Sequence, residues 1–181
     1  MILLTGASAS GKTEVAKMLM KKYNIQKVIT TTTREKRINE VDGVDYFFVS
    51  KQKFEQMINN GEFVEYTLFN GNLYGSTKAQ IGNEKCLVID PVGLKSYLTL
   101  NNNKIITFIL EADEETRIAR MKLRGDNPEK IESRIKNDRI AFKKENIPEV
   151  DYHIDSSSNS TIEEITDLIY KIYLEESKKR K

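Results

Sequence analysis

The chain has 181 residues, of which 39% are hydrophobic and 31% are charged, and its formal net charge is +2. This composition is typical of one ordinary globular domain, and so small a net charge gives no indication of binding to nucleic acid or to a membrane surface. No apolar run approaches the ~20 residues of a membrane span and the N-terminus lacks the basic flank of a signal peptide, so we expect a cytoplasmic protein without a membrane partner.

The first predicted elements enclose a phosphate-binding motif. Residues 2–5 are apolar and predict a strand, and residues 12–23 have the pattern of an amphipathic helix. The segment between them has the spacing G-x-x-x-x-G-K-[ST], in which glycines let backbone amides turn toward phosphate oxygens at the positive end of the helix. Lys12 can reach the β- and γ-phosphates of ATP, and the Thr13 hydroxyl can ligate Mg²⁺. The predicted ATP-binding residues are Gly6, Ala7, Ser8, Ala9, Ser10, Gly11, Lys12 and Thr13.

The next part of the chain predicts a small antiparallel sheet. Gly61 is a natural helix C-cap, and Asn70-Gly71 is the strongest short hairpin signal available. The predicted elements are a strand at 46–49, a helix at 50–60, and two strands at 62–69 and 72–75.

Further apolar runs predict a parallel sheet, because they alternate with helical patterns and are continuous enough for strands buried on both faces. Cys86 lies in one of these runs, and we expect it to be a buried strand residue. As the only cysteine it excludes an intrachain disulfide, and His153, the only histidine, leaves histidine triads and multi-histidine zinc sites without ligands. These strands are predicted at 27–30, 85–90, 104–110 and 152–155.

Local signals predict where the later helices begin. Asp113 and the pair Asn127-Pro128 are typical N-caps, and Ser160 with Glu163 fits a capping box. The last helix carries an apolar stripe that we expect to face the core. The stripe consists of Ile162, Ile165, Ile169, Ile172 and Tyr173.

A second group of anion-binding side chains follows residue 30. Arg34 and Arg37 lie three residues apart among threonine hydroxyls, with Tyr46 further on. Guanidinium groups bind phosphate oxygens bidentately, so this segment suits a second phosphate. From these residues alone, a charged surface loop is the alternative.

Several motifs in order resemble the guanylate kinase family. The family segment T-T-R-x-x-R-x-G-E is matched by residues 32–40, and D-G-x-D-Y-x-F-V-S by residues 42–50. The motifs E-F-x-E and G-N-x-Y-G-[ST] are matched by residues 62–65 and 71–76. The lid motif R-x-x-x-R-G is matched by residues 120–125, and the similarity extends from residue 2 to about residue 155.

The resemblance implies a phosphoryl transfer from ATP to GMP that gives ADP and GDP, with Mg²⁺ as cofactor. It implies that Arg34, Arg37, Tyr46 and Tyr74 hold the GMP phosphate. It implies that Thr30, Glu65, Ser76 and Asp90 face the guanine. A carboxylate such as Glu65 accepts from both donors on the guanine pairing edge, whereas adenine places an acceptor there. The implied catalytic residues are Lys12, Arg34, Arg37, Arg120, Arg124 and Arg134.

The resemblance also implies an architecture. It is an α/β fold with a P-loop NTPase-type parallel sheet flanked by helices, a small antiparallel lobe that binds the nucleoside monophosphate, and a helical lid. The expected single domain 1–181 divides into a core at 1–30, 77–119 and 145–181, a GMP-binding lobe at 31–76, and a lid at 120–144. Monomer and homodimer are both left open.

Several departures from the family pattern are present, and two alternatives stay open. Val88 stands where the family has an aspartate, and Asn39 replaces a glycine. The lid is about one residue short, and Ser156 stands near the place of an asparagine expected at the adenine pocket. One alternative is a nucleoside monophosphate kinase with another acceptor. The other is a catalytically inactive interaction module of the same fold.

Overall fold

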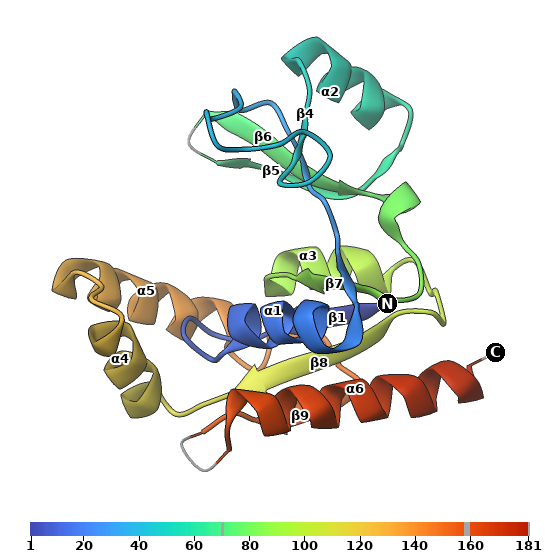
Figure 1. The fold of residues 1–181 in the computed structure, drawn as a ribbon. Coiled ribbons are helices and arrows are strands. Elements are labelled where there is room, and N and C mark those ends of the chain that lie inside the picture. The colour runs from blue at the N-terminus through green and yellow to red at the C-terminus, as the bar shows by residue number, and fades with distance from the viewer. Residues whose placement is uncertain (70, 158–159, 181) are drawn as a thin grey trace.

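Five strands form the larger of two sheets in the computed structural model, which describes residues 1–69, 71–157 and 160–180 (Figure 1). They are β1 (Ile2–Thr5), β2 (Gln26–Lys27), β7 (Lys85–Val88), β8 (Ile106–Glu111) and β9 (Tyr152–Asp155). Their spatial order is β2-β7-β1-β8-β9, so the first strand lies in the middle. Every neighbouring pair runs parallel, which confirms the expected α/β core.

Helices cover both faces of this sheet. They are α1 (Lys12–Tyr23), α3 (Pro91–Leu98) and α6 (Ile162–Lys179). Because side chains alternate along a strand, Leu4 packs with Phe108 in the core on the side of α1 and α6, while Leu3 packs with Leu94 on the side of α3. Within the described part of the chain, no helix is long and apolar enough to span a membrane.

The smaller sheet stands above the core sheet in Figure 1. It consists of β3 (Thr31–Thr32), β4 (Phe47–Phe48), β5 (Phe63–Phe69) and β6 (Asn72–Thr77), in the order β4-β3-β6-β5. The expected antiparallel hairpin is confirmed for β5 with β6. The strand β3 was not predicted; it runs antiparallel to β6 and parallel to β4. The residue Asn70 of the predicted hairpin turn lies outside the described residues.

One face of the smaller sheet is covered by α2 (Lys51–Asn59). Phe54 of the helix stacks on Phe63 of β5, with ring centroids 4.4 Å apart, and both are buried. Ser50 caps the helix by accepting from the Lys53 amide, and Gly61 follows its C-terminus with a φ of 65°. A 3₁₀ turn at Lys78–Gln80 then leads back to the core sheet.

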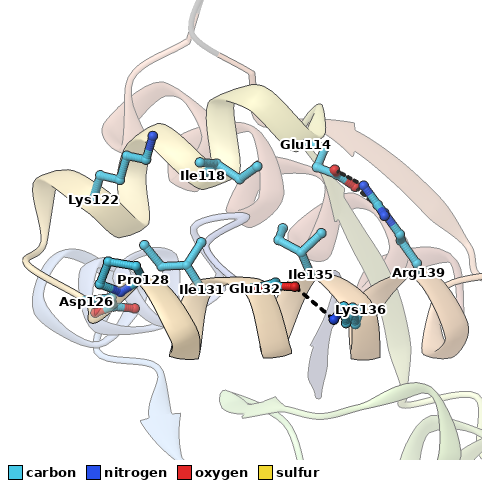
Figure 2. A pocket seen from close by; sticks show the side chains of 10 residues that line it. All are labelled: Glu114, Ile118, Lys122, Asp126, Pro128, Ile131, Glu132, Ile135, Lys136 and Arg139. Atoms are coloured by element: carbon cyan, nitrogen blue, oxygen red, sulfur yellow. Dashed lines mark hydrogen bonds and ion pairs between the residues drawn. The ribbon is translucent and has the colours of Figure 1, made fainter.

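The helices α4 (Glu114–Leu123) and α5 (Pro128–Ala141) form a hairpin at one side of the core (Figure 1). Asp113 and Asn127 cap them, as expected. Their contact is the hairpin cluster, which consists of Met121, Ile131 and Ile135. Figure 2 shows the groove between the two helices, a cavity of about 450 Å³. The ion pair Glu114–Arg139 joins the two helices at its rim, whereas the ion pair Glu132–Lys136 lies along α5.

Some predicted boundaries were wrong. The strand expected at 27–30 is β2 and ends at Lys27, because the chain then leaves the core sheet and enters the smaller sheet at Thr31. The strand expected at 85–90 ends at Val88, since Asp90 caps α3 instead, accepting from the Gly93 amide at 2.8 Å. The capping box of α6 lies one residue later than expected, at Thr161 and Glu164. The rest of this helix agrees with the prediction, since the apolar stripe on α6 packs on the core.

Candidate functional site

The phosphate loop turns between β1 and α1 with backbone angles that favour glycine. Gly6 has a φ of 141° and Gly11 a φ of 96°, while Ala9 has a left-handed φ of 62°. A Cβ on Gly6 would collide with the carbonyl oxygen of Leu110. Gly6 is therefore required by the turn and by the close approach of β8, and Gly11 by its backbone conformation.

Lys12 points back over this loop. Its Nζ donates to the Ala7 carbonyl at 2.7 Å and lies 3.3 Å from the Ser10 hydroxyl. Burial lowers the pKa of Lys12 to about 8, with nearby Asp138 opposing and Arg117 adding to this effect. An incoming polyphosphate would meet a desolvated ammonium held at the centre of the loop.

A cavity of about 360 Å³ opens beside the loop. Six of the predicted donor-site residues line it: Ala9, Gly11, Lys12 and Thr13 of the loop and α1, and Arg120 and Arg124 of α4 and its C-terminal end. Arg120 also bridges two segments, since it donates to the carbonyls of Ala9 at 3.3 Å and of Ser156 at 2.6 Å. This cavity is the candidate donor site.

Arg134 does not line this cavity. It lies 3.5 Å from Asp126, which also forms an ion pair with Arg124. The Arg124 hydrogen bond holds the pKa of the Asp126 carboxyl below its usual range. One lid carboxylate therefore engages two of the three predicted lid arginines.

A second cluster of predicted residues lies on the smaller sheet. Arg34 forms an ion pair with Glu40 at 2.6 Å, and its guanidinium lies 5.4 Å from the centre of the Tyr46 ring. The rings of Tyr46 and Tyr74 meet edge to face, with centroids 6.0 Å apart. Arg37 is exposed, and its charge acts on Glu40 together with that of Arg34. A guanidinium and two phenols thus converge, with a second guanidinium at the edge of the cluster.

The predicted guanine-facing residues are divided between two cavities. Glu65 and Asp90 line a cavity of about 400 Å³, while Thr30 lines another, of about 350 Å³, with Tyr46 and Val88. Glu65 accepts from the Ser76 amide at 3.1 Å and from its hydroxyl. Burial raises the pKa of Glu65, and the Asp90 charge acts in the same direction. Glu65, Ser76 and Asp90 are thus near one another, and Thr30 is not among them.

A family model described as guanylate kinase matches residues 1–172. The chain belongs to the guanylate kinase family. Similar curated guanylate kinases include that of Clostridioides difficile, 37% identical over 74% of this chain and 69% of the relative. That of Mycoplasmoides gallisepticum is 34% identical over 94% of this chain and 91% of the relative.

A solved structure supports the fold. The crystal structure of guanylate kinase from Anaplasma phagocytophilum has a TM-score of 0.66 over 97% of this chain and 85% of that chain, at 24% identity. The resemblance read from the motifs and the predicted fold class are both confirmed.

The residues available for a metal in this guanylate kinase-family chain are few. Thr13 is exposed at the start of α1, beside Lys12 in the donor cavity. The described residues contain no group of three or more histidine, cysteine, aspartate or glutamate side chains that could hold an ion. The side chains therefore fit an ion that is bound chiefly by nucleotide phosphates, with one hydroxyl from the protein.

Two polar contacts of the phosphate loop were missed by sequence reasoning. Ser8 contacts the buried Asp138 of α5, and the Ser156 hydroxyl donates to the Ser10 carbonyl at 2.8 Å. A signal for Asp138 exists, since it continues the stripe of Ile131 and Ile135 on the buried face of α5 at helical spacing. A carboxylate in such a stripe indicates a partner supplied by the tertiary structure.

Proposed function

We propose that this chain transfers the terminal phosphoryl group of ATP to the phosphate of GMP, giving ADP and GDP. The observation that carries the proposal is the pairing of two anion sites: the loop cavity with Lys12, Arg120 and Arg124, and the cluster of Arg34 with two tyrosines. Membership in the guanylate kinase family supports this choice of substrates. An attacking GMP oxygen forms the new bond to the γ-phosphorus as the bond to the ADP oxygen breaks.

On the donor side, the loop amides and Lys12 would hold the β- and γ-phosphates of ATP. Thr13 would share Mg²⁺ with the phosphate oxygens, and a bound Mg²⁺ neutralises charge on the transferred group. Arg120 and Arg124 already line the cavity, where they would stabilise charge that develops in transfer. Arg134 would join them only after leaving Asp126, which requires movement of its side chain or of the lid.

On the acceptor side, Arg34, Arg37, Tyr46 and Tyr74 would hold the GMP phosphate and aim it at the γ-phosphorus. No general base is needed, because this phosphate is already an oxyanion. Glu65, held by Ser76, would accept from the two donors of guanine, with Asp90 and Thr30 completing the acceptor pocket. Thr30 would reach the base only if its cavity and that of Glu65 are joined on binding.

The proposed division into a core (1–30, 77–119 and 145–181), a GMP lobe (31–76) and a lid (120–144) follows from these roles. Each phosphate then binds on a different part, so closure brings donor and acceptor together and excludes water. A reaction that consumes ATP is expected where ATP is plentiful, and a cytoplasmic location is part of the proposal.

The test is ADP release in a coupled assay with Mg·ATP and, separately, GMP, dGMP, AMP, CMP and UMP. We expect turnover with GMP, and a loss of about 10²–10³-fold in kcat for Lys12→Met, because a preorganised phosphate contact disappears. Lys136→Met on the exposed face of α5 is the matched control and should match the unsubstituted chain.

Each other result has a definite meaning. Turnover with only one of the other monophosphates would mean that this nucleotide, and not GMP, is the acceptor. Nucleotide binding without turnover of any acceptor would favour the inactive interaction module.

A further inference from the structure

A buried ion pair joins the α4–α5 hairpin to the phosphate loop. Arg117 of α4 donates from Nη1 to Oδ2 of Asp138 on α5 at 2.8 Å, and the two side chains are only 8% and 11% exposed. The same Oδ2 accepts the backbone N–H of Ser8 at 2.9 Å, and Oδ1 accepts the Ser8 hydroxyl at 3.1 Å. One carboxylate therefore receives two hydrogen bonds from the loop and one from the hairpin.

Asp138 compensates the buried positive charge of Arg117. The Arg117 Nε is buried and has no hydrogen-bond partner among the described residues, and its Nη1 reaches the Ser8 carbonyl only at 3.4 Å. A buried cation is tolerated when a carboxylate pairs with it and becomes costly when that partner is removed. Compensation of the Arg117 charge is thus one role of Asp138. This role would not require the contacts between Asp138 and the phosphate loop.

The two hydrogen bonds from Ser8 to Asp138 have a different consequence, because they hold the phosphate loop next to its left-handed residue. The next residue, Ala9, is left-handed and packs against the hairpin cluster. Lys12 donates to Ala7 and to Ser10, the residues on either side of Ser8 and Ala9. A shift of Ser8 would therefore move both acceptors that hold the Lys12 ammonium.

We propose that Asp138 is a positioning residue of the donor site, which fixes the phosphate loop through Ser8 so that the loop is shaped for ATP before ATP binds. The hairpin thereby contributes to donor binding through a residue that touches no substrate. This inference rests on the proposed function and deepens it, since it concerns the binding of ATP and not that of GMP.

The test separates positioning from neutralisation with two variants. Asp138→Asn removes the carboxylate charge and leaves Arg117 buried without compensation. The double variant Arg117→Met with Asp138→Asn removes both charges of the pair, yet Ser8 still lacks its carboxylate. Glu132→Gln is the matched control, because it makes the same type of change on the exposed groove face of the same helix (Figure 2). The readouts are the dissociation constant of Mg·ATP by calorimetry, the KM for GMP at saturating ATP, and the melting temperature.

We expect both Asp138 variants to bind Mg·ATP about tenfold more weakly, which corresponds to ~1.4 kcal/mol. The KM for GMP should stay within about twofold, since loop and acceptor cluster are separate. The melting temperature should fall for Asp138→Asn alone and should be largely restored in the double variant. Ser8→Ala, which removes one loop bond and no charge, should weaken ATP binding by about threefold, and it tests the proposal even if both Asp138 variants fail to fold.

The proposal is overturned if the double variant binds Mg·ATP as tightly as the unsubstituted chain, since Asp138 would then only neutralise Arg117. Equal losses for ATP and GMP would also overturn it, because they would indicate a general loss of structure. A failure of the proposed function has a separate signature: the unsubstituted chain itself would not phosphorylate GMP.

Discussion

Glu65 is the residue on which the proposed choice of guanine depends. Its side chain is held by Ser76 before any nucleotide binds. Glu65→Gln exchanges one acceptor oxygen for an NH₂ donor, which would oppose a donor of guanine, and a mispaired buried group costs about 1–3 kcal/mol. We expect kcat/KM for GMP to fall roughly 5–150-fold while that for AMP rises relative to it, because adenine offers one donor and one acceptor. The assay compares the two acceptors at fixed Mg·ATP.

The control for this substitution is Glu62→Gln, the same chemical change at a half-buried position just before β5. A pH series adds a second readout. Burial raises the pKa of Glu65, and a protonated carboxyl has lost one acceptor, so the preference for GMP over AMP should decrease as pH falls through that pKa. The Gln variant should show no such decrease. If it keeps the preference of the unsubstituted chain, Glu65 does not recognise the base.

The position of a single side chain could be predicted where a local motif determines it, and could not be predicted where long-range packing determines it. Lys12 lies over its loop as the motif implies, since the spacing of the motif determines the turn. Asp138 has no such motif, and its contact with Ser8 spans 130 residues of sequence. Arg134 was predicted from its order after the lid motif, yet its present partner is Asp126. Order along a helix does not determine which way a long side chain turns.

The phosphate loop is the element whose backbone tolerates least change. Gly6→Ala would place a Cβ against the Leu110 carbonyl, at a φ that other residues rarely adopt. We expect a loss of at least about 2 kcal/mol in the free energy of unfolding, together with loss of Mg·ATP binding. Denaturant unfolding and calorimetry measure the two effects.

The matched control is Gly82→Ala, where a Cβ would meet no heavy atom of the described residues within 4 Å. Its effect should stay within about 0.5 kcal/mol. If the two variants unfold at the same denaturant concentration, the close approach of Gly6 to β8 does not constrain the loop.

Elements with strong local signals were predictable from the sequence, and elements defined by their neighbours were not. Asp113 and Asn127 gave two helix starts, because a cap is satisfied within its own turn. The end of β2 at Lys27 and the transfer of Thr31 to the smaller sheet depend instead on which strands lie beside them. The helix α3 was missed, although Asp90 followed by Pro91 is itself a start signal, because the apolar run before it suggested a longer strand.

At the scale of the whole molecule, the two anion sites lie on different parts of the fold. The donor loop adjoins the core sheet, and the acceptor cluster lies on the smaller sheet. The smaller sheet meets the core where β5 lies against α3, beside the cavity of Glu65 and Asp90. The donor loop is held from the other side by the α4–α5 hairpin. Binding of GMP to the smaller sheet would therefore stabilise the core against unfolding only if both parts unfold as one unit.

The thiol of Cys86 can test this coupling, because it lies in β7 of the core sheet, although it also lines the cavity of Thr30 and Tyr46. It is only 3% exposed, and burial raises its pKa to about 12, so the native thiol should be inert to alkylation at neutral pH. If the chain unfolds as one unit, GMP at about 100 times its dissociation constant should add ~2.7 kcal/mol and slow labelling of Cys86 about 100-fold in mild denaturant. Glu65→Gln at the same GMP concentration is the control and should give little protection. Labelling slowed by Mg·ATP but unaffected by GMP would contradict the prediction, because it would mean that the smaller sheet opens without the core.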